Sequence, residues 1–115
     1  MRRVNVHEVS PGVVLRRGEV TVRAFAVPHG DWEHAFGYRF ESRGEVIVIS
    51  GDMRPNPNIL RYAKGADVLV LEAYLPEFFD KVDTPEVAAR LKSYHTSAEE
   101  AGEIAAAAGV RTLVL

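Results

Sequence analysis

Three short apolar segments of this chain each end at a histidine or a carboxylate, and this recurrence constrains the fold more than any other feature. The three pairs of segment and polar residue are Val20–Pro28 with His29, Val46–Ile49 with Asp52, and Val68–Leu71 with Glu72. Short runs that are rich in β-branched residues and bounded by Gly, Pro or Asp are typical of strands. Because ligands bind outside the carboxyl ends of strands in open α/β sheets, we expect these side chains to meet at one edge.

The composition fits one folded domain. The 115 residues are 47% hydrophobic and 26% charged, which is enough apolar material for a core of its own. No apolar run approaches the roughly 20 residues that cross a bilayer, so we expect no membrane association. The N-terminal segment Met1–Val6 lacks the apolar stretch of a signal peptide, and this predicts a cytoplasmic location.

Cysteine content and charge limit the kinds of site. The chain has no cysteine, so any metal would be held by imidazole and carboxylate, which suits Zn²⁺, Mn²⁺ or Fe. The net charge is −2 and the longest basic runs are the pairs Arg2-Arg3 and Arg16-Arg17. A broad nucleic-acid surface is therefore not expected. A small phosphate-bearing substrate fits this charge.

The first half of the chain is predicted to be β-rich and the second half to consist of βα units. Expected strands in the first half are Val4–Val6, Val13–Leu15, Val20–Pro28, Phe36–Glu41 and Glu45–Ile49, the last two forming a hairpin. Expected elements in the second half are a helix from Pro57 capped by Asn56, a strand Val68–Leu71, a helix Pro85–Ser93 after an irregular stretch from Pro76, a helix Ala98–Ala108, and a strand Thr112–Leu115. Ser97 and Glu100 form a capping box for the helix that Gly109 ends.

His29 and Asp52 are candidate metal ligands. His29 is followed by Gly30, which lets the backbone turn sharply and leaves the imidazole exposed at the strand end. The alternative for His29 is a polar loop histidine. Asp52 could bridge two metal ions, since an anionic oxygen neutralises both, or it could be an ordinary turn aspartate after Gly51.

Glu72 and His95 are candidate catalytic residues. Glu72 ends a buried strand, where an ionised group is costly unless it is paired. A carboxylate that binds His95 would orient the ring and favour its protonated form, and such a pair could donate a proton to a leaving oxygen. The alternative for His95 is a loop residue beside a helix cap. His7 and His34 carry little signal, although His34 could contact a substrate.

Several motifs in order resemble the C-terminal half of the metallo-β-lactamase-fold hydrolases, in the branch of ribonuclease Z and its arylsulfatase-like and phosphodiesterase-like relatives. The matching stretches are Val27–Gly30, Ala35–Phe40, Ile49–Asp52, Gly65–Ala73, Tyr94–Ser97 and Glu100–Gly102. The resemblance runs from about Val20 to the end of the chain. It implies half of an αββα four-layer sandwich with a dinuclear metal centre, zinc or manganese, that activates water to cleave phosphodiester or sulfate-ester bonds.

By position, the resemblance implies a role for each candidate. His29 is similar to a histidine ligand and Asp52 to the bridging aspartate of the family. Glu72 and His95 are similar to the pair that polarises or protonates the leaving group. Leu71 stands where many relatives have a histidine, and Met53 stands where threonine is usual. Neither change removes a proposed metal ligand.

The family's His-x-His-x-Asp-His motif does not occur in the sequence. We therefore expect residues 1–115 to be the C-terminal part of a single metallo-β-lactamase-like domain whose N-terminal part is absent, and we do not expect hydrolysis by this chain alone. The expected partners are a small phosphate or sulfate ester, or an RNA 3′ end, and either the missing half or a second copy of the chain. The alternative functions are a non-catalytic binding or assembly module and a homodimeric half-domain.

Overall fold

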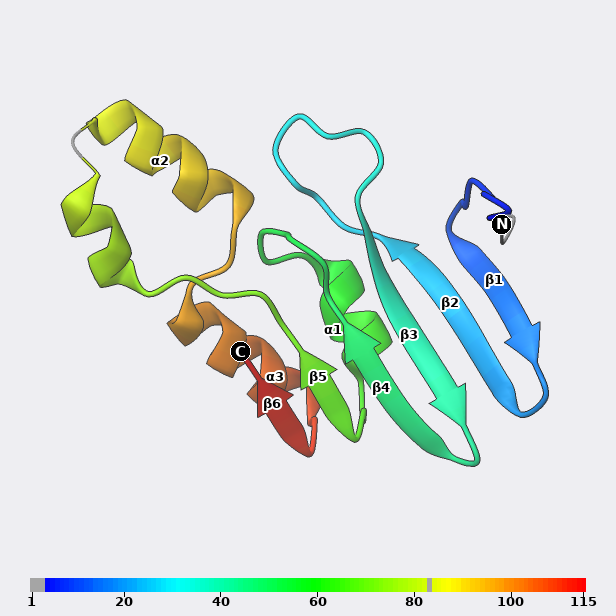
Figure 1. Ribbon diagram of the computed structural model, residues 1–115. Helices are drawn as coiled ribbons and strands as arrows, with labels where there is room; N and C mark the ends of the chain where they lie inside the picture. Colours follow the sequence, from blue (N-terminus) through cyan, green and yellow to red (C-terminus); the bar gives the residue numbers. More distant parts are fainter. Residues whose placement is uncertain (1–3, 83) are drawn as a thin grey trace.

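The computed structural model describes residues 4–82 and 84–115, and it contains one mixed sheet with two helices packed on one face (Figure 1). The strands follow one another across the sheet in chain order: β1 (Gly12–Arg17), β2 (Val20–Ala26), β3 (Phe36–Ser42), β4 (Glu45–Ile49), β5 (Val68–Val70) and β6 (Thr112–Val114). The helices are α1 (Pro57–Ala63), the 3₁₀ helix η1 (Pro76–Lys81), α2 (Pro85–Tyr94) and α3 (Ala98–Ala108).

Strand directions bring the candidate residues to one edge of the sheet. Strands β1 to β4 are antiparallel, and β4, β5 and β6 are parallel. It follows that β2, β4, β5 and β6 all end at the same edge, as their arrowheads show in Figure 1. His29, Asp52 and Glu72 come after β2, β4 and β5, so the topology places all three there.

The core lies between the sheet and helices α1 and α3. Val48 of β4 and Leu69 of β5 point toward the helices and are fully buried. They pack against apolar side chains that include Ile59 of α1 and Ile104 of α3. Tyr62 of α1 also stacks on Phe25 of β2, with 4.4 Å between ring centroids. The side of the sheet that faces the helices therefore forms a well-packed hydrophobic core.

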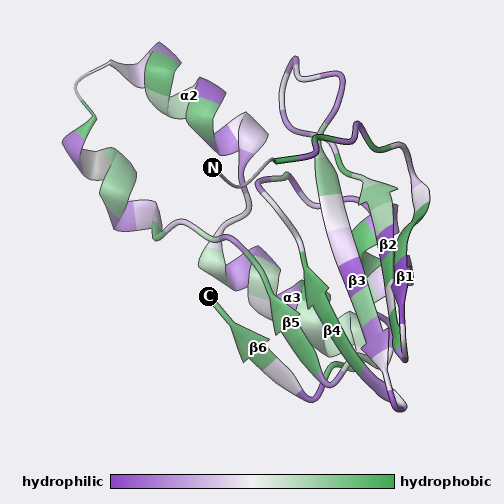
Figure 2. Ribbon diagram, turned by 45° about the vertical axis from the view of Figure 1, so that its right-hand side comes forward, coloured by the Kyte–Doolittle hydropathy of each residue, from purple (hydrophilic) through white to green (hydrophobic). Residues whose placement is uncertain are grey.

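Over β4 to β6, the opposite face of the sheet is apolar and uncovered in the described part of the chain, whereas Val22 and Ala24 of β2 on that face are buried. Because side chains alternate along a strand, Ile47 and Ile49 of β4 point away from the helices, and they are 43% and 40% exposed. The strand register continues this surface from Ile49 to Tyr38 on one side and to Val70 and Val114 on the other. Figure 2 shows β4 and β5 coloured hydrophobic with the helices behind them.

The predicted α/β class is confirmed, and most element positions agree with the sequence-based prediction. Asn56 caps α1 by accepting from two backbone amides, and the capping box of α3 is present. The predicted strand Val4–Val6 is wrong: this segment has no strand partner, and both valines are more than four-fifths exposed. The stretch from Pro76 is a 3₁₀ helix rather than irregular.

No helix among the described residues has the length and apolar character that crossing a membrane requires.

Candidate metal site and catalytic pair

Three side chains from separate loops converge at the edge where the strands end. His29, Asp52 and His95 each offer one possible metal-ligating atom, and these atoms lie within 4.8 Å of one another. The ring centroids of His29 and His95 are 5.2 Å apart, with the rings edge to face. The predicted ligands His29 and Asp52 are therefore brought together, and His95 joins them.

The loop after β2 holds His29 in place. The amide of Trp32 donates to the His29 carbonyl oxygen at 3.0 Å, which closes a tight turn. Gly30 within this turn has a φ of +54°, and a Cβ there would lie 2.3 Å from the ring of Tyr94. The Tyr94 ring thus lies directly against the glycine, and its centroid is 5.7 Å from that of His29.

One atom of His29 has no partner. Among the described residues, His29 Nε2 is buried and forms no hydrogen bond. A buried polar atom without a partner is costly, and an imidazole nitrogen is a common zinc ligand. The nearby donors are a second imidazole and a carboxylate, the ligand types that zinc accepts. The residues present therefore fit a metal ion, and such an ion would satisfy Nε2.

Asp52 reaches the site from a turn that requires a glycine before it. Gly51 has a φ of +65°, and a Cβ there would lie 2.6 Å from the carbonyl oxygen of Phe36. Only glycine fits this conformation without displacing β3. The turn leaves Asp52 exposed beside a hollow of 290 Å³ that it lines together with His29 and Trp32.

Glu72 and His95 form the predicted pair. Oε1 of Glu72 lies 3.2 Å from Nδ1 of His95, and both side chains are about three-quarters buried. The same oxygen accepts from the backbone amides of Met53, at 3.2 Å, and Thr96, at 3.1 Å. With a carboxylate as acceptor, Nδ1 of His95 carries the proton and Nε2 is left for another partner.

Thr96 and Met53 connect the loops, and sequence reasoning gave neither of them a role. The buried hydroxyl of Thr96 donates to the Met53 carbonyl oxygen at 2.7 Å. Together with Glu72, these bonds connect the loop after β4, the end of β5 and the start of α3. The only feature of the sequence that could have indicated these two residues is that each follows a candidate site residue directly.

Tyr74 lies beside the pair. Burial of the Tyr74 phenol raises its pKa above the usual value of 10.0, and the negative charges of Glu100 and Glu72 raise it further. The phenol therefore stays neutral. The Tyr74 amide donates to the Thr96 carbonyl oxygen, and the Tyr74 carbonyl oxygen accepts from the Ala98 amide. These two hydrogen bonds hold the segment after β5 against the start of α3.

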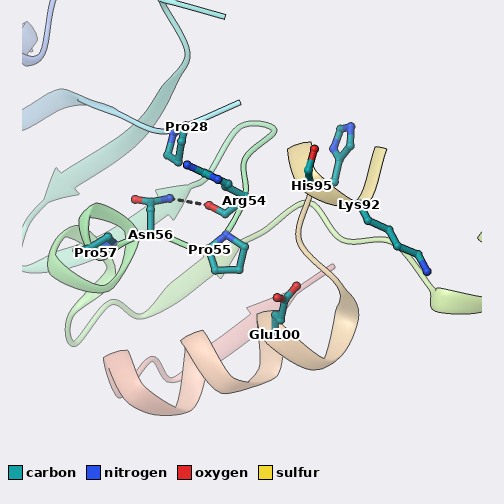
Figure 3. A pocket seen from close by; sticks show the side chains of 9 residues that line it. Pro28, Arg54, Pro55, Asn56, Pro57, Lys92, His95 and Glu100 are labelled. Atoms are coloured by element: carbon teal, nitrogen blue, oxygen red, sulfur yellow. Dashed lines mark hydrogen bonds between the residues drawn. The ribbon is translucent and has the colours of Figure 1, made fainter. Parts of the chain in front are cut away.

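A larger hollow of 560 Å³ lies on another side of His95 (Figure 3). Pro28, Arg54 and Lys92 contribute to its walls, and the side-chain amide of Asn56 donates to the Arg54 carbonyl oxygen at 2.9 Å. In Figure 3 the amino group of Lys92 points away from Arg54. The two cations do not converge on one point.

The remaining histidines stand apart from the cluster. His34 is exposed and stacks on Phe36, with 6.5 Å between ring centroids. It is not among the described residues that could share a metal ion, and neither is His7.

Residues 2–115 match the family model described as a beta-lactamase superfamily domain. The ribonuclease Z of Mycobacterium tuberculosis strain H37Rv is 33% identical over 112 residues, and the match covers 97% of this chain and 41% of that protein. The crystal structure of human tRNase Z, short form, superimposes on this chain with a TM-score of 0.64 at 21% identity. The match covers 89% of this chain and 38% of the tRNase Z chain. The crystal structure of the metallo-beta-lactamase fold protein YhfI from Bacillus subtilis has a TM-score of 0.65 at 21% identity. The match covers 86% of this chain and 37% of the YhfI chain. The chain thus spans less than half the length of these proteins.

Proposed function

Since this chain belongs to the beta-lactamase superfamily, we propose that it is the C-terminal portion of a metal-dependent hydrolase that cleaves phosphodiester bonds. The observation that carries the proposal is the convergence of His29, Asp52 and His95 within 4.8 Å, next to a carboxylate that orients one of the imidazoles. The ribonuclease Z relatives support a phosphodiester as the bond that is cleaved.

In this proposal, His29 and Asp52 hold the metal, which is zinc or alternatively manganese. A bound zinc ion would supply Lewis acidity to the ester and lower the pKa of water. The buried Nε2 of His29 and the exposed carboxylate of Asp52 reach the same point from two different loops. These two ligands form only part of a tightly held site, because catalytic zinc sites usually have three protein ligands.

Glu72 and His95 deliver a proton to the leaving oxygen. Glu72 Oε1 is fixed by two backbone amides, so it can hold Nδ1 of His95 in one orientation. The Nε2 of a protonated His95 would then donate to the leaving group. Because His95 also lies within reach of the other two donors, it serves in the neutral form as an alternative third ligand.

The substrate is a phosphodiester, and the similarity to a ribonuclease Z and a tRNase Z favours RNA over a sulfate ester. This segment has a net charge of −2, so it supplies no broad positive surface for RNA. Such a surface would have to come from elsewhere in a longer protein.

We further propose that residues 1–115 form one half of a single domain and that an N-terminal half carrying the His-x-His-x-Asp-His motif covers the open face. The relatives are more than twice as long as this chain, and the open face is apolar. Large uncovered apolar patches are unusual on folded monomers. A second copy of the chain is the alternative occupant, and a homodimer in sedimentation experiments would favour it.

The test is hydrolysis of a chromogenic phosphodiester by the chain joined to an N-terminal half with that motif. We expect turnover with zinc, and a loss of about a hundredfold or more in Asp52→Ala. The control is His34→Ala, which removes a histidine outside the cluster. Full activity of Asp52→Ala would overturn the proposal and favour a non-catalytic binding module.

A further inference from the structure

Trp32 is the only tryptophan of the chain, and it stands exposed at the mouth of the candidate site. Its surface is 69% accessible, and its ring centroid lies 6.2 Å from that of His29. It lines the 290 Å³ hollow with His29 and Asp52, and also a neighbouring hollow of 350 Å³ with Tyr94 and Arg90. A large aromatic surface therefore borders the position where the reacting group would be held.

The loop that carries Trp32 is fixed at both ends. The hydrogen bond from the Trp32 amide to His29 closes the turn, and the amide of Val27 donates to the Ala35 carbonyl oxygen at 3.0 Å. On the outer side, the Tyr94 hydroxyl donates to Asp31 at 3.1 Å. The indole is thus held on an ordered loop, which lowers the entropy that a ligand must overcome.

The surroundings favour a neutral planar group over an anion on the indole. Asp31 and Glu33 flank Trp32 in the sequence and line the same outer hollow. Arg90 lies near Asp31, with 3.8 Å between the charged atoms, so its charge is largely balanced there. A phosphate would be repelled from this side, whereas a nucleobase could stack.

We propose that Trp32 is a stacking platform for the nucleobase next to the scissile phosphate, an inference that rests on the proposed phosphodiester hydrolysis. The phosphate would lie over His29 and Asp52, and the base attached to the same nucleotide would lie on the neighbouring indole ring. The substrate is then a nucleotide chain rather than a phosphodiester without bases. Base–aromatic stacking is tolerant of sequence, so no strong preference for one base is expected.

Fluorescence of the single tryptophan tests this directly. The chain is titrated with adenosine monophosphate and, in parallel, with ribose 5-phosphate, which lacks the base. We expect saturable quenching by the nucleotide alone, after correction with free N-acetyltryptophanamide. Binding of the nucleotide, followed by calorimetry, should weaken about tenfold in Trp32→Ala and much less in Trp32→Phe, which keeps a ring.

The outcomes separate this inference from the proposed function. Equal affinities for the two ligands, or unchanged nucleotide affinity in Trp32→Ala, would overturn the platform. Hydrolysis that depends on Asp52 would then still stand, because it does not require stacking. The substitution is at an exposed position, so an unfolded variant is not expected, and circular dichroism verifies this.

Discussion

At the scale of single residues, one carboxylate oxygen organises the site. Oε1 of Glu72 accepts from the amides of Met53 and Thr96 and contacts the His95 ring. The three partners come from two loops that are far apart in sequence. Glu72 therefore has a structural task, which is to satisfy two amides, and a proposed catalytic one, which is to orient His95.

Substitution of Glu72 should separate these tasks. Glu72→Gln keeps an oxygen that can accept from both amides but loses the negative charge, so we expect stability to change by less than about 1 kcal/mol while hydrolysis falls about a hundredfold. Glu72→Ala leaves both amides without a partner and should cost about 2 kcal/mol or more. Urea unfolding of the chain measures the stabilities, and steady-state kinetics of the chain joined to an N-terminal half with the His-x-His-x-Asp-His motif measures hydrolysis. Equal destabilisation by both substitutions would contradict this division.

Sequence reasoning found the pair but not the residues that support it. His29, Asp52, Glu72 and His95 each adjoin the end of a strand or the start of a helix, and that position can be seen in the sequence. The contact between Tyr94 and Gly30 cannot be seen in the sequence, because the two residues are far apart in the chain and the contact depends on the exact course of the loop.

At the scale of elements, side-chain caps mark where α1 and α3 start. The Ser97 side chain accepts from the amide of Glu100 at 3.2 Å, and the Glu100 side chain accepts from the Ser97 amide at 2.8 Å. Such pairs act within four residues, so the sequence predicts them well. The segment Val4–Val6 shows the opposite case, because a strand requires a partner that local composition does not reveal.

Removal of the cap should destabilise α3. We expect Ser97→Ala to lower the free energy of unfolding by about 1 kcal/mol, because the amide of Glu100 loses its acceptor. Ser97→Asp keeps an acceptor and should stay near the original stability. Thermal unfolding followed by circular dichroism measures both, and an unchanged midpoint for Ser97→Ala would show that the cap contributes little.

At the scale of the whole molecule, the uncovered part of the sheet face is the observation that bears on the proposed N-terminal half. Ile47 and Val48 are neighbours on β4, yet Val48 is fully buried beneath the helices and Ile47 is 43% exposed on the open face. The sequence does not show this difference, because Val46–Ile49 is apolar at every position. The sequence does not identify an occupant of the open face, because an exposed apolar strand residue has the same local pattern as a covered one.

Ile47→Glu tests whether that face becomes covered. In the chain alone, we expect little loss of stability and less self-association, since the carboxylate meets water. In a protein that includes the N-terminal half, the same substitution should cost several kcal/mol, because the charge would be buried between two sheets. Urea unfolding of both proteins supplies the comparison. Equal, small effects in both would show that the face stays open.

We propose that His29 and Asp52 bind a metal ion beside the Glu72–His95 pair, and zinc titration of the purified chain by calorimetry measures that binding. We expect saturable binding that weakens about tenfold or more in His29→Ala, since Nε2 of His29 is the proposed ligand, and that is unchanged in His34→Ala. Zinc binding that is the same in His29→Ala as in the unaltered chain would contradict it.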